Sequence, residues 1–155
     1  MSYDKKFLAL KGLPPMPEVP KGANFILFRR TGKLLTLSGS GPLKGAIIPS
    51  QYKGKLGKEV SIKQGYNAAR LTAMNLLLIT RAAIKTLDKI DYIVNVEGTV
   101  NCTPDFTDQP SVINGCSDLL VEIFGKNGHH TRSAIGACSL AFDISVEISM
   151  SLMIK

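Results

Sequence analysis

Two charged residues near the end of the chain have the types and the spacing that a small-molecule site needs. Arg132 stands among small residues in the segment HHTRSAIGACSL, and Glu147 interrupts the apolar run DISVEISMSLMI. A guanidinium can hold a planar carboxylate through two parallel hydrogen bonds, and a carboxylate can orient a water molecule and accept its proton. This pair therefore predicts a site for a small carboxylate substrate and a water.

Alternation along the chain places both charges on predicted strands, because successive side chains point to opposite faces. One face of residues 131–140 then carries Arg132, Ala134, Gly136 and Cys138. In residues 144–154, Glu147 lies on the face opposite the apolar positions, with Ser145, Ser149 and Ser151. The apolar positions of that strand are Ile144, Val146, Ile148, Met150, Leu152 and Ile154.

A tight turn near Leu140 and Ala141 is expected to pair these two strands. Ala134 would then lie opposite Glu147, with Arg132 one diagonal step away at roughly 7–8 Å between Cα atoms. A ligand or a water bridges such a gap more naturally than a direct salt bridge does. The pattern leaves an alternative open, in which Glu147 is merely solvated and Arg132 pairs with another acid.

The remaining elements predict one two-layer α+β domain over residues 1–155. Prolines at positions 14, 15, 17 and 20 predict an extended, non-helical N-terminal segment over residues 1–22. Residues 24–31 and 33–40 form a predicted hairpin, and the glycine-rich stretch 41–58 a long irregular loop. Ser61 and Gln64 fit a capping box at the start of a helix that runs to about Leu87. A strand over 91–101 and a helix over 110–124, ended by Gly125, complete two helices on one face of a four- to five-stranded sheet.

Composition narrows the classes of partner. The net charge of +7 suggests nucleic acid as a possible partner. However, the lysines are scattered except at Lys53, Lys55 and Lys58, and the chain has no tryptophan on which bases could stack. A solvated basic surface is therefore the preferred interpretation. Neither a signal peptide nor a membrane-spanning run is visible, which predicts a cytosolic protein without membrane contact. Three widely spaced cysteines, Cys102, Cys116 and Cys138, support neither a disulfide framework nor a metal site and are expected to be small buried residues.

Other motifs carry weaker signals. His129 and His130 lie in the turn-like context GKNGHH, where exposed histidines without a ligand are the expected case. Asp105 and Asp108 fit turn and helix-start positions better than an acid–base pair. The segment SGSGP lacks the spacing and the lysine of a phosphate-binding loop.

Several segments together resemble the RidA (YjgF) family. They are SGSGP near Ser38, QGYNAARLTAMNLL in the first long helix, DQPSVING from Asp108, and RSAIG with Glu147 fifteen residues after the arginine. The resemblance implies a chorismate-mutase-like fold with two helices on a mixed sheet, and a homotrimer with sites at subunit interfaces. It also implies hydrolysis of enamines and imines to keto acids and ammonia, without a metal or another cofactor.

The resemblance also assigns roles to residues. Arg132 matches the family's carboxylate-binding arginine, and Glu147 matches the residue that directs the water. Main-chain groups of Ser38, Gly39 and Ser40 would lie beside the ligand, because glycine lets the backbone approach closely. Asn114 would contact the site from an adjoining subunit, or else be a surface or capping residue.

Two departures from the family pattern indicate a longer sub-branch. Ala134 stands two residues after the arginine, where many relatives carry a cysteine, and Phe25 stands near the place of a frequent tyrosine. Three hypotheses follow: an imine deaminase; a trimer that binds a carboxylate metabolite without turnover, which the missing thiol favours; and an RNA-binding or endoribonuclease (L-PSP-like) protein, which the positive charge favours.

Overall fold

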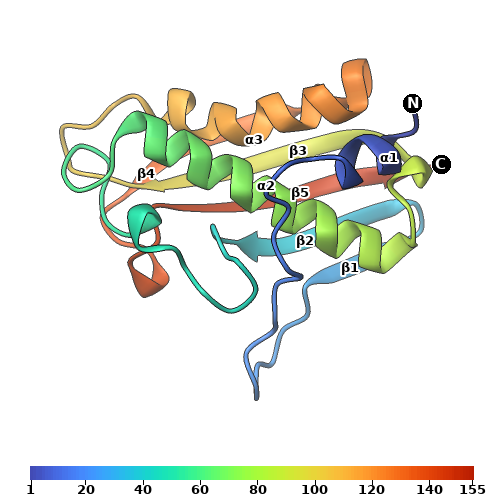
Figure 1. Cartoon of the computed structure of the whole chain (residues 1–155), viewed down its shortest axis with the longest axis horizontal. Helices are drawn as coiled ribbons and strands as arrows, with labels where there is room; N and C mark the ends of the chain where they lie inside the picture. Colours follow the sequence, from blue (N-terminus) through green and yellow to red (C-terminus); the bar gives the residue numbers. More distant parts are fainter.

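The computed structural model describes all 155 residues, and its longest elements are two helices that cover one face of a five-stranded sheet (Figure 1). The strands are β1 (Phe28–Thr31), β2 (Leu34–Ser40), β3 (Ile90–Asn101), β4 (Thr131–Ala137) and β5 (Val146–Ile154). The helices are α1 (Tyr3–Leu8), α2 (Ile62–Ile84) and α3 (Gln109–Phe124). Short 3₁₀ turns occupy Ser50–Tyr52, Leu87–Lys89, Gly125–Gly128 and Ala141–Asp143.

The sheet has the strand order β1-β2-β5-β3-β4. All neighbours are antiparallel except β3 and β4, which run parallel. A parallel pair needs a crossover connection, and α3 provides it between β3 and β4. The predicted two-layer α+β fold, with two helices on one face of a mixed sheet, is therefore confirmed.

The two long helices pack closely against each other and against the sheet. Helix α2 starts at the predicted capping box: the Ser61 hydroxyl accepts from the Gln64 amide, and the Gln64 side chain accepts from the Ser61 amide. At the crossing of α2 and α3, a Cβ on Gly115 would lie 1.9 Å from the carbonyl oxygen of Tyr66, so only glycine fits there. This contact fixes the place of α3, which carries Asn114 and Ser117.

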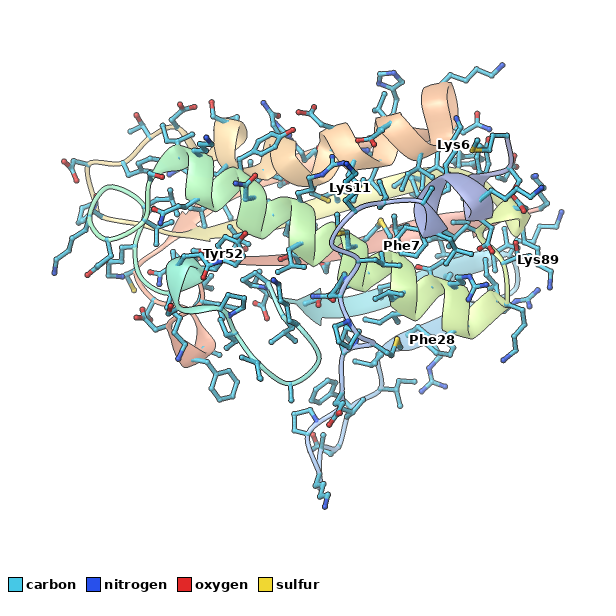
Figure 2. The ribbon with its side chains drawn as sticks, viewed as in Figure 1. Lys6, Phe7, Lys11, Phe28, Tyr52 and Lys89 are labelled. Carbon is cyan, nitrogen blue, oxygen red and sulfur yellow. The ribbon has the colours of Figure 1, made fainter.

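The N-terminal prediction is wrong in one part, because residues 3–8 are helical rather than extended. Ser2 caps α1 by accepting from the Lys5 amide, and Phe7, fully buried, joins the main core (Figure 2). Arg81 on α2 donates to the Asp4 carboxylate at 3.0 Å and ties the short helix down. The prolines begin at Pro14, six residues after α1 ends, so they do not prevent this helix from forming. After the prolines, the chain forms a loop that projects from the rest of the domain before it enters β1 (Figure 1).

Other elements lie close to their predicted bounds. The first strand of the hairpin starts at Phe28 rather than at residue 24, and residues 41–58 form the expected irregular connection around one 3₁₀ turn at Tyr52. Cys102 and Cys116 are buried as expected, but Cys138 is exposed because β4 ends at Ala137. None of the helices combines the length and the apolar character needed to cross a membrane.

Candidate functional site

Arg132 and Glu147 do not share a face of the sheet, and their strands are not neighbours. On β3, Val96 pairs with Arg132 of β4 and with Met150 of β5, and both Val96 and Met150 are buried under the helices. Paired residues point to one face, so Arg132 lies on the helix side. Glu147 pairs with Thr99, which lies three positions after Val96 on β3. Because side chains alternate between the faces, Glu147 lies on the opposite, open face of the sheet.

The predicted pairing of the strands of Arg132 and Glu147 is thus wrong. β3 lies between β4 and β5, because the chain leaves the edge strand β4 through the turn at Ala141–Asp143 and returns as β5 on the other side of β3. Ala134 pairs with Gly98 rather than with Glu147. Local periodicity gives the face of each strand but not which strand lies beside it.

The arginine belongs to a cluster that we call the guanidinium half-site: Arg132, Asn114, Ser117 and His130. Arg132 Nη1 donates to Asn114 Oδ1 at 2.8 Å and to Ser117 Oγ at 3.1 Å. Asn114 and Ser117 lie three residues apart on α3 and so face the same side of that helix. The contact of Asn114 with Arg132 forms within one chain, and the entry of Asn114 into a site from an adjoining subunit stays a prediction.

His130 extends this cluster by two hydrogen bonds. Its Nε2 lies 2.9 Å from Ser117 Oγ, and its Nδ1 lies 2.6 Å from the carbonyl oxygen of Gly128. Burial lowers the pKa of His130; the nearby charges of Arg132 and His129 act in the same direction, and the Gly128 carbonyl opposes them. The expectation of an exposed turn histidine holds for His129, which is exposed, but is wrong for His130, which is half-buried.

Arg132 has no acidic partner in the chain. It is half-buried, yet no carboxylate forms a salt bridge with it, so the alternative in which it pairs with another acid is wrong. Burial raises the pKa of the neighbouring Cys116 thiol to about 12, which keeps that group uncharged. A cavity of about 450 Å³ opens beside the arginine, lined by Ser117, Asp118, Val121, Glu122, His129, His130 and Arg132. A guanidinium without a counter-ion in such a cavity can bind an anion.

Glu147 belongs to a second cluster, the carboxylate half-site: Glu147, Gly39, Ser40 and Phe25. A Cβ on Gly39 would lie 3.1 Å from the Glu147 carboxyl carbon and Oε1, so glycine leaves the room that this side chain occupies. These four residues line a largely apolar cavity of about 490 Å³, together with Leu27, Leu43, Ile48, Phe142 and Ile144. Glu147 forms no salt bridge, and its carboxyl group packs against Gly39 at the wall of this apolar cavity.

Buried polar contacts hold the backbone around this second cavity. The fully buried Asn75 on α2 donates to the carbonyl oxygens of Gly41 at 3.1 Å and Leu43 at 2.9 Å. Ser38 Oγ donates to the carbonyl oxygen of Ile26 at 2.6 Å, which binds the end of β2 to the segment before β1. Because these backbone groups are satisfied, the loop that starts at Gly41 is fixed where it borders the site.

A strained turn supplies one lining residue that no sequence pattern indicated. Phe142 and Asp143 both adopt left-handed backbone conformations with φ of 57°, which residues with a side chain rarely adopt. The Gly54 amide donates to the Asp143 carbonyl at 2.8 Å, and Asn101 Nδ2 donates to Asp143 Oδ1 at 3.3 Å. These two hydrogen bonds hold the turn in its strained conformation, and the turn places the exposed Phe142 ring at the rim of the Glu147 cavity.

The predicted site residues thus fall into two groups. Arg132 and Asn114 meet in the guanidinium half-site, and Ala134 lies half-buried two residues along the same face of β4. Phe25, Gly39, Ser40 and Glu147 meet in the carboxylate half-site, while Ser38 and Phe25 border a neighbouring hollow. Ser117 and the burial of His130 were not predicted; the spacing of Asn114 and Ser117 on one helix face was the signal available. No three His, Cys, Asp or Glu side chains lie close enough together to hold a metal ion.

The fold and the site together define a two-layer α+β protein: a mixed five-stranded sheet with two helices on one face, an arginine on the side of α3 and a glutamate next to β2. The family model described as "YjgF/chorismate_mutase-like, putative endoribonuclease" matches residues 8–146. The chain belongs to this family, as its sequence motifs predicted.

Three known proteins show how far the likeness extends. Protein TCP17 of Trypanosoma cruzi is 33% identical over 126 residues, which is 81% of this chain and 78% of TCP17. The crystal structure of Atu1372, a protein of unknown function from Agrobacterium tumefaciens, has a TM-score of 0.89 at 33% identity and covers 99% of this chain and 92% of its own. A structure from Shewanella oneidensis, described as a putative endoribonuclease, has a TM-score of 0.88 at 27% identity and covers 99% and 100%.

Proposed function

We propose that the protein hydrolyses 2-imino acids, and their enamine tautomers, to 2-keto acids and ammonia. One observation carries the proposal: a half-buried guanidinium and an exposed carboxylate each border a cavity, and neither has a partner of opposite charge within the chain. A 2-imino acid supplies what both lack, a planar carboxylate for Arg132 and an electrophilic carbon beside a water for Glu147.

We further propose that each site forms between two subunits of a homotrimer. Because the two half-sites lie on opposite faces of one sheet, a single chain cannot present both to one small molecule. A second copy can bring its Glu147 to the first copy's Arg132. The open face also carries apolar side chains that an assembly would cover, among them Ile135, 58% exposed, and Tyr92, 43% exposed.

In the assembled site each group has a separate task. Arg132 holds the substrate carboxylate, and Asn114 keeps the guanidinium in place by accepting from Nη1. Glu147 accepts a proton from a water that attacks the imine carbon; the C=N bond becomes a C–N single bond, and ammonia leaves after the nitrogen gains a proton. The apolar walls around Glu147 receive the side chain of the substrate. Holding the two reactants together supplies much of the rate, since imines hydrolyse spontaneously.

A second candidate is a protein that binds the same carboxylate metabolite without turnover. Ala134 favours it, because a methyl group beside the arginine cannot help to hold a water as a thiol could. The two candidates differ in a single measurement, which is turnover of an imine. Endoribonuclease activity, the name given to several relatives, is the third outcome, and a linear fall of RNA affinity with log salt that survives Arg132→Ala would support it.

The test is the release of ammonia from 2-iminopropanoate and 2-iminobutanoate, generated in the assay by an amino-acid oxidase or a dehydratase. The wild-type chain should accelerate release, and Arg132→Ala should remove the acceleration. Arg132→Lys is the matched variant, because lysine keeps the charge but loses the two-pronged geometry; its KM should rise on the order of 10-fold. Full activity in Arg132→Ala would refute the site, and a monomer in light scattering would refute the shared-site assembly.

A further inference from the structure

Ser117 and His130 form a pair that takes no chemical step in the proposed imine hydrolysis. Ser117 Oγ lies 2.9 Å from His130 Nε2, and His130 Nδ1 lies 2.6 Å from the carbonyl oxygen of Gly128. A carbonyl oxygen only accepts hydrogen bonds, so Nδ1 carries the hydrogen and Nε2 of the neutral ring offers its lone pair. The Ser117 hydroxyl therefore donates to a base whose tautomer and orientation are fixed by the main chain.

A positive charge lies on the other side of the serine oxygen. Arg132 Nη1 donates to Ser117 Oγ at 3.1 Å. As the hydroxyl gives up its proton, negative charge develops at that oxygen, and a guanidinium at this distance stabilises it. Nucleophile, base, orienting group and cation thus occur together, in the arrangement that activates a serine.

The pair is accessible, and the acids near it are engaged elsewhere. Ser117, His130 and Arg132 all line the cavity of about 450 Å³ described above. Glu122 at its edge pairs with Arg70 at 2.7 Å, and Asp118 accepts from the Tyr66 hydroxyl at 2.8 Å. Neither carboxylate forms an ion pair with Arg132, so an acyl compound that enters the cavity meets the serine beside a cation that no acid of the chain contacts.

We propose that Ser117 is a nucleophile that cleaves small carboxylic esters and similar activated acyl compounds, with His130 as its base. Ser117 Oγ forms a bond to the acyl carbon while its proton passes to His130 Nε2. The tetrahedral intermediate breaks the bond to the alcohol oxygen, which leaves with that proton. Water then attacks the acyl-serine, again giving a proton to His130, and releases the carboxylic acid together with the restored hydroxyl. Neither Glu147 nor a second subunit enters these steps, so the proposal stands apart from imine hydrolysis.

The test is covalent labelling of the full chain by an alkyl fluorophosphonate, read by peptide mass spectrometry. Ser117 Oγ should form a bond to phosphorus as fluoride leaves, and the label should map to Ser117. His130→Ala should slow labelling by about 100-fold, the usual contribution of a positioned base. Ser111→Ala, which changes another serine of α3 whose hydroxyl donates to Asp108, is the matched control and should label like the wild type.

A second measurement guards against a variant that fails to fold. Ser117→Cys keeps a small nucleophile in place, and iodoacetamide should alkylate that sulfur faster with His130 present than in the double variant with His130→Ala. Hydrolysis of p-nitrophenyl acetate should follow the same order as labelling. Absence of label at Ser117 in the folded wild type, or equal rates with and without His130, would overturn the proposal and leave the pair as a support for Arg132.

Discussion

The guanidinium of Arg132 and the carboxylate of Glu147 lie on opposite faces of one sheet, on strands that β3 separates. In the proposed trimer, a second copy of the chain supplies the missing half of each site. Two inactive variants should therefore complement each other when they are mixed in one trimer.

Arg132→Ala and Glu147→Gln, each inactive alone, should regain activity after mixing by co-expression or refolding. In a random equal mixture, half of the subunits offer an intact arginine and half an intact glutamate, so about one quarter of the interfaces is complete in a cyclic trimer. Ammonia release should return to about that fraction of the wild-type rate. A mixture no more active than its components would show that both residues act within one chain.

Gly39 makes room for the carboxylate that is proposed to direct the water. A methyl group there would lie 3.1 Å from the Glu147 carboxyl, closer than ordinary contact, and would push the side chain aside by a few tenths of an ångström. Gly39→Ala should lower kcat on the order of 10-fold and leave KM nearly unchanged, because Arg132 in the other half-site is untouched.

A thermal-unfolding cycle separates this contact from a backbone effect. Gly39→Ala should lower the Tm in the wild-type background and much less in a Glu147→Ala background, where the crowded side chain is absent. Equal losses in the two backgrounds would place the effect in the backbone of β2 instead.

Much of the fold was predictable because its signals are local. Three such signals are the capping box of Ser61 and Gln64, the proline in the first turn of α3 with the glycine after its end, and the period-two pattern of β5. Each depends on neighbouring residues, and each element lies where its signal places it. The motif spacing around Arg132 identified the family for the same reason. The short α1 was missed although Ser2 offers a local cap, because a helix of six residues is held mainly by distant contacts, of Phe7 with the core and of Asp4 with Arg81.

The arrangement of the site was less predictable because it depends on strand order. Alternation placed Glu147 opposite the apolar face of its strand correctly, but nothing in the chain between Leu140 and Ile144 indicates that β5 crosses to the far side of β3. Ser117 and His130 lie thirteen positions apart and meet only because α3 packs beside β4. The left-handed turn at Phe142 gave no signal, since such turns usually carry glycine or asparagine.

Asn114 offers a graded test of Arg132 as an anion site. Its Oδ1 accepts from Arg132 at 2.8 Å, so Asn114→Ala removes one hydrogen bond, while Asn114→Asp puts a negative charge against the guanidinium. Affinity for a keto acid such as 2-oxobutanoate, measured by calorimetry, should fall from wild type to Asn114→Ala and further to Asn114→Asp. The loss in the aspartate variant should exceed 10-fold, because its carboxylate competes for the same cation. Tighter binding in that variant than in Asn114→Ala would exclude an anion at Arg132.

His130 predicts how stability changes with pH. Burial, reinforced by the charges of Arg132 and His129, holds the pKa of His130 below its ordinary value of 6.5, although the Gly128 carbonyl opposes the shift. Below pH 6.5 His130 binds a proton in the unfolded chain. In the folded chain it binds that proton only when the pH reaches its lower, folded pKa. The free energy of unfolding should therefore decrease as the pH falls through this window, and this contribution should be constant above it.

Chemical denaturation at fixed protein concentration, repeated between pH 7.5 and about pH 5, measures this slope. His130→Asn keeps an amide nitrogen near the position of Nδ1, where it can still donate to Gly128, but removes the titrating ring. The slope of its unfolding free energy against pH should therefore be smaller, because the proton that His130 binds no longer contributes. His129→Asn, at the exposed neighbouring position, is the matched control and should keep the wild-type slope. A slope that both variants share with the wild type would mean that His130 titrates alike in the folded and unfolded chains, and that its hydrogen bonds to Ser117 and Gly128 do not depend on a neutral ring.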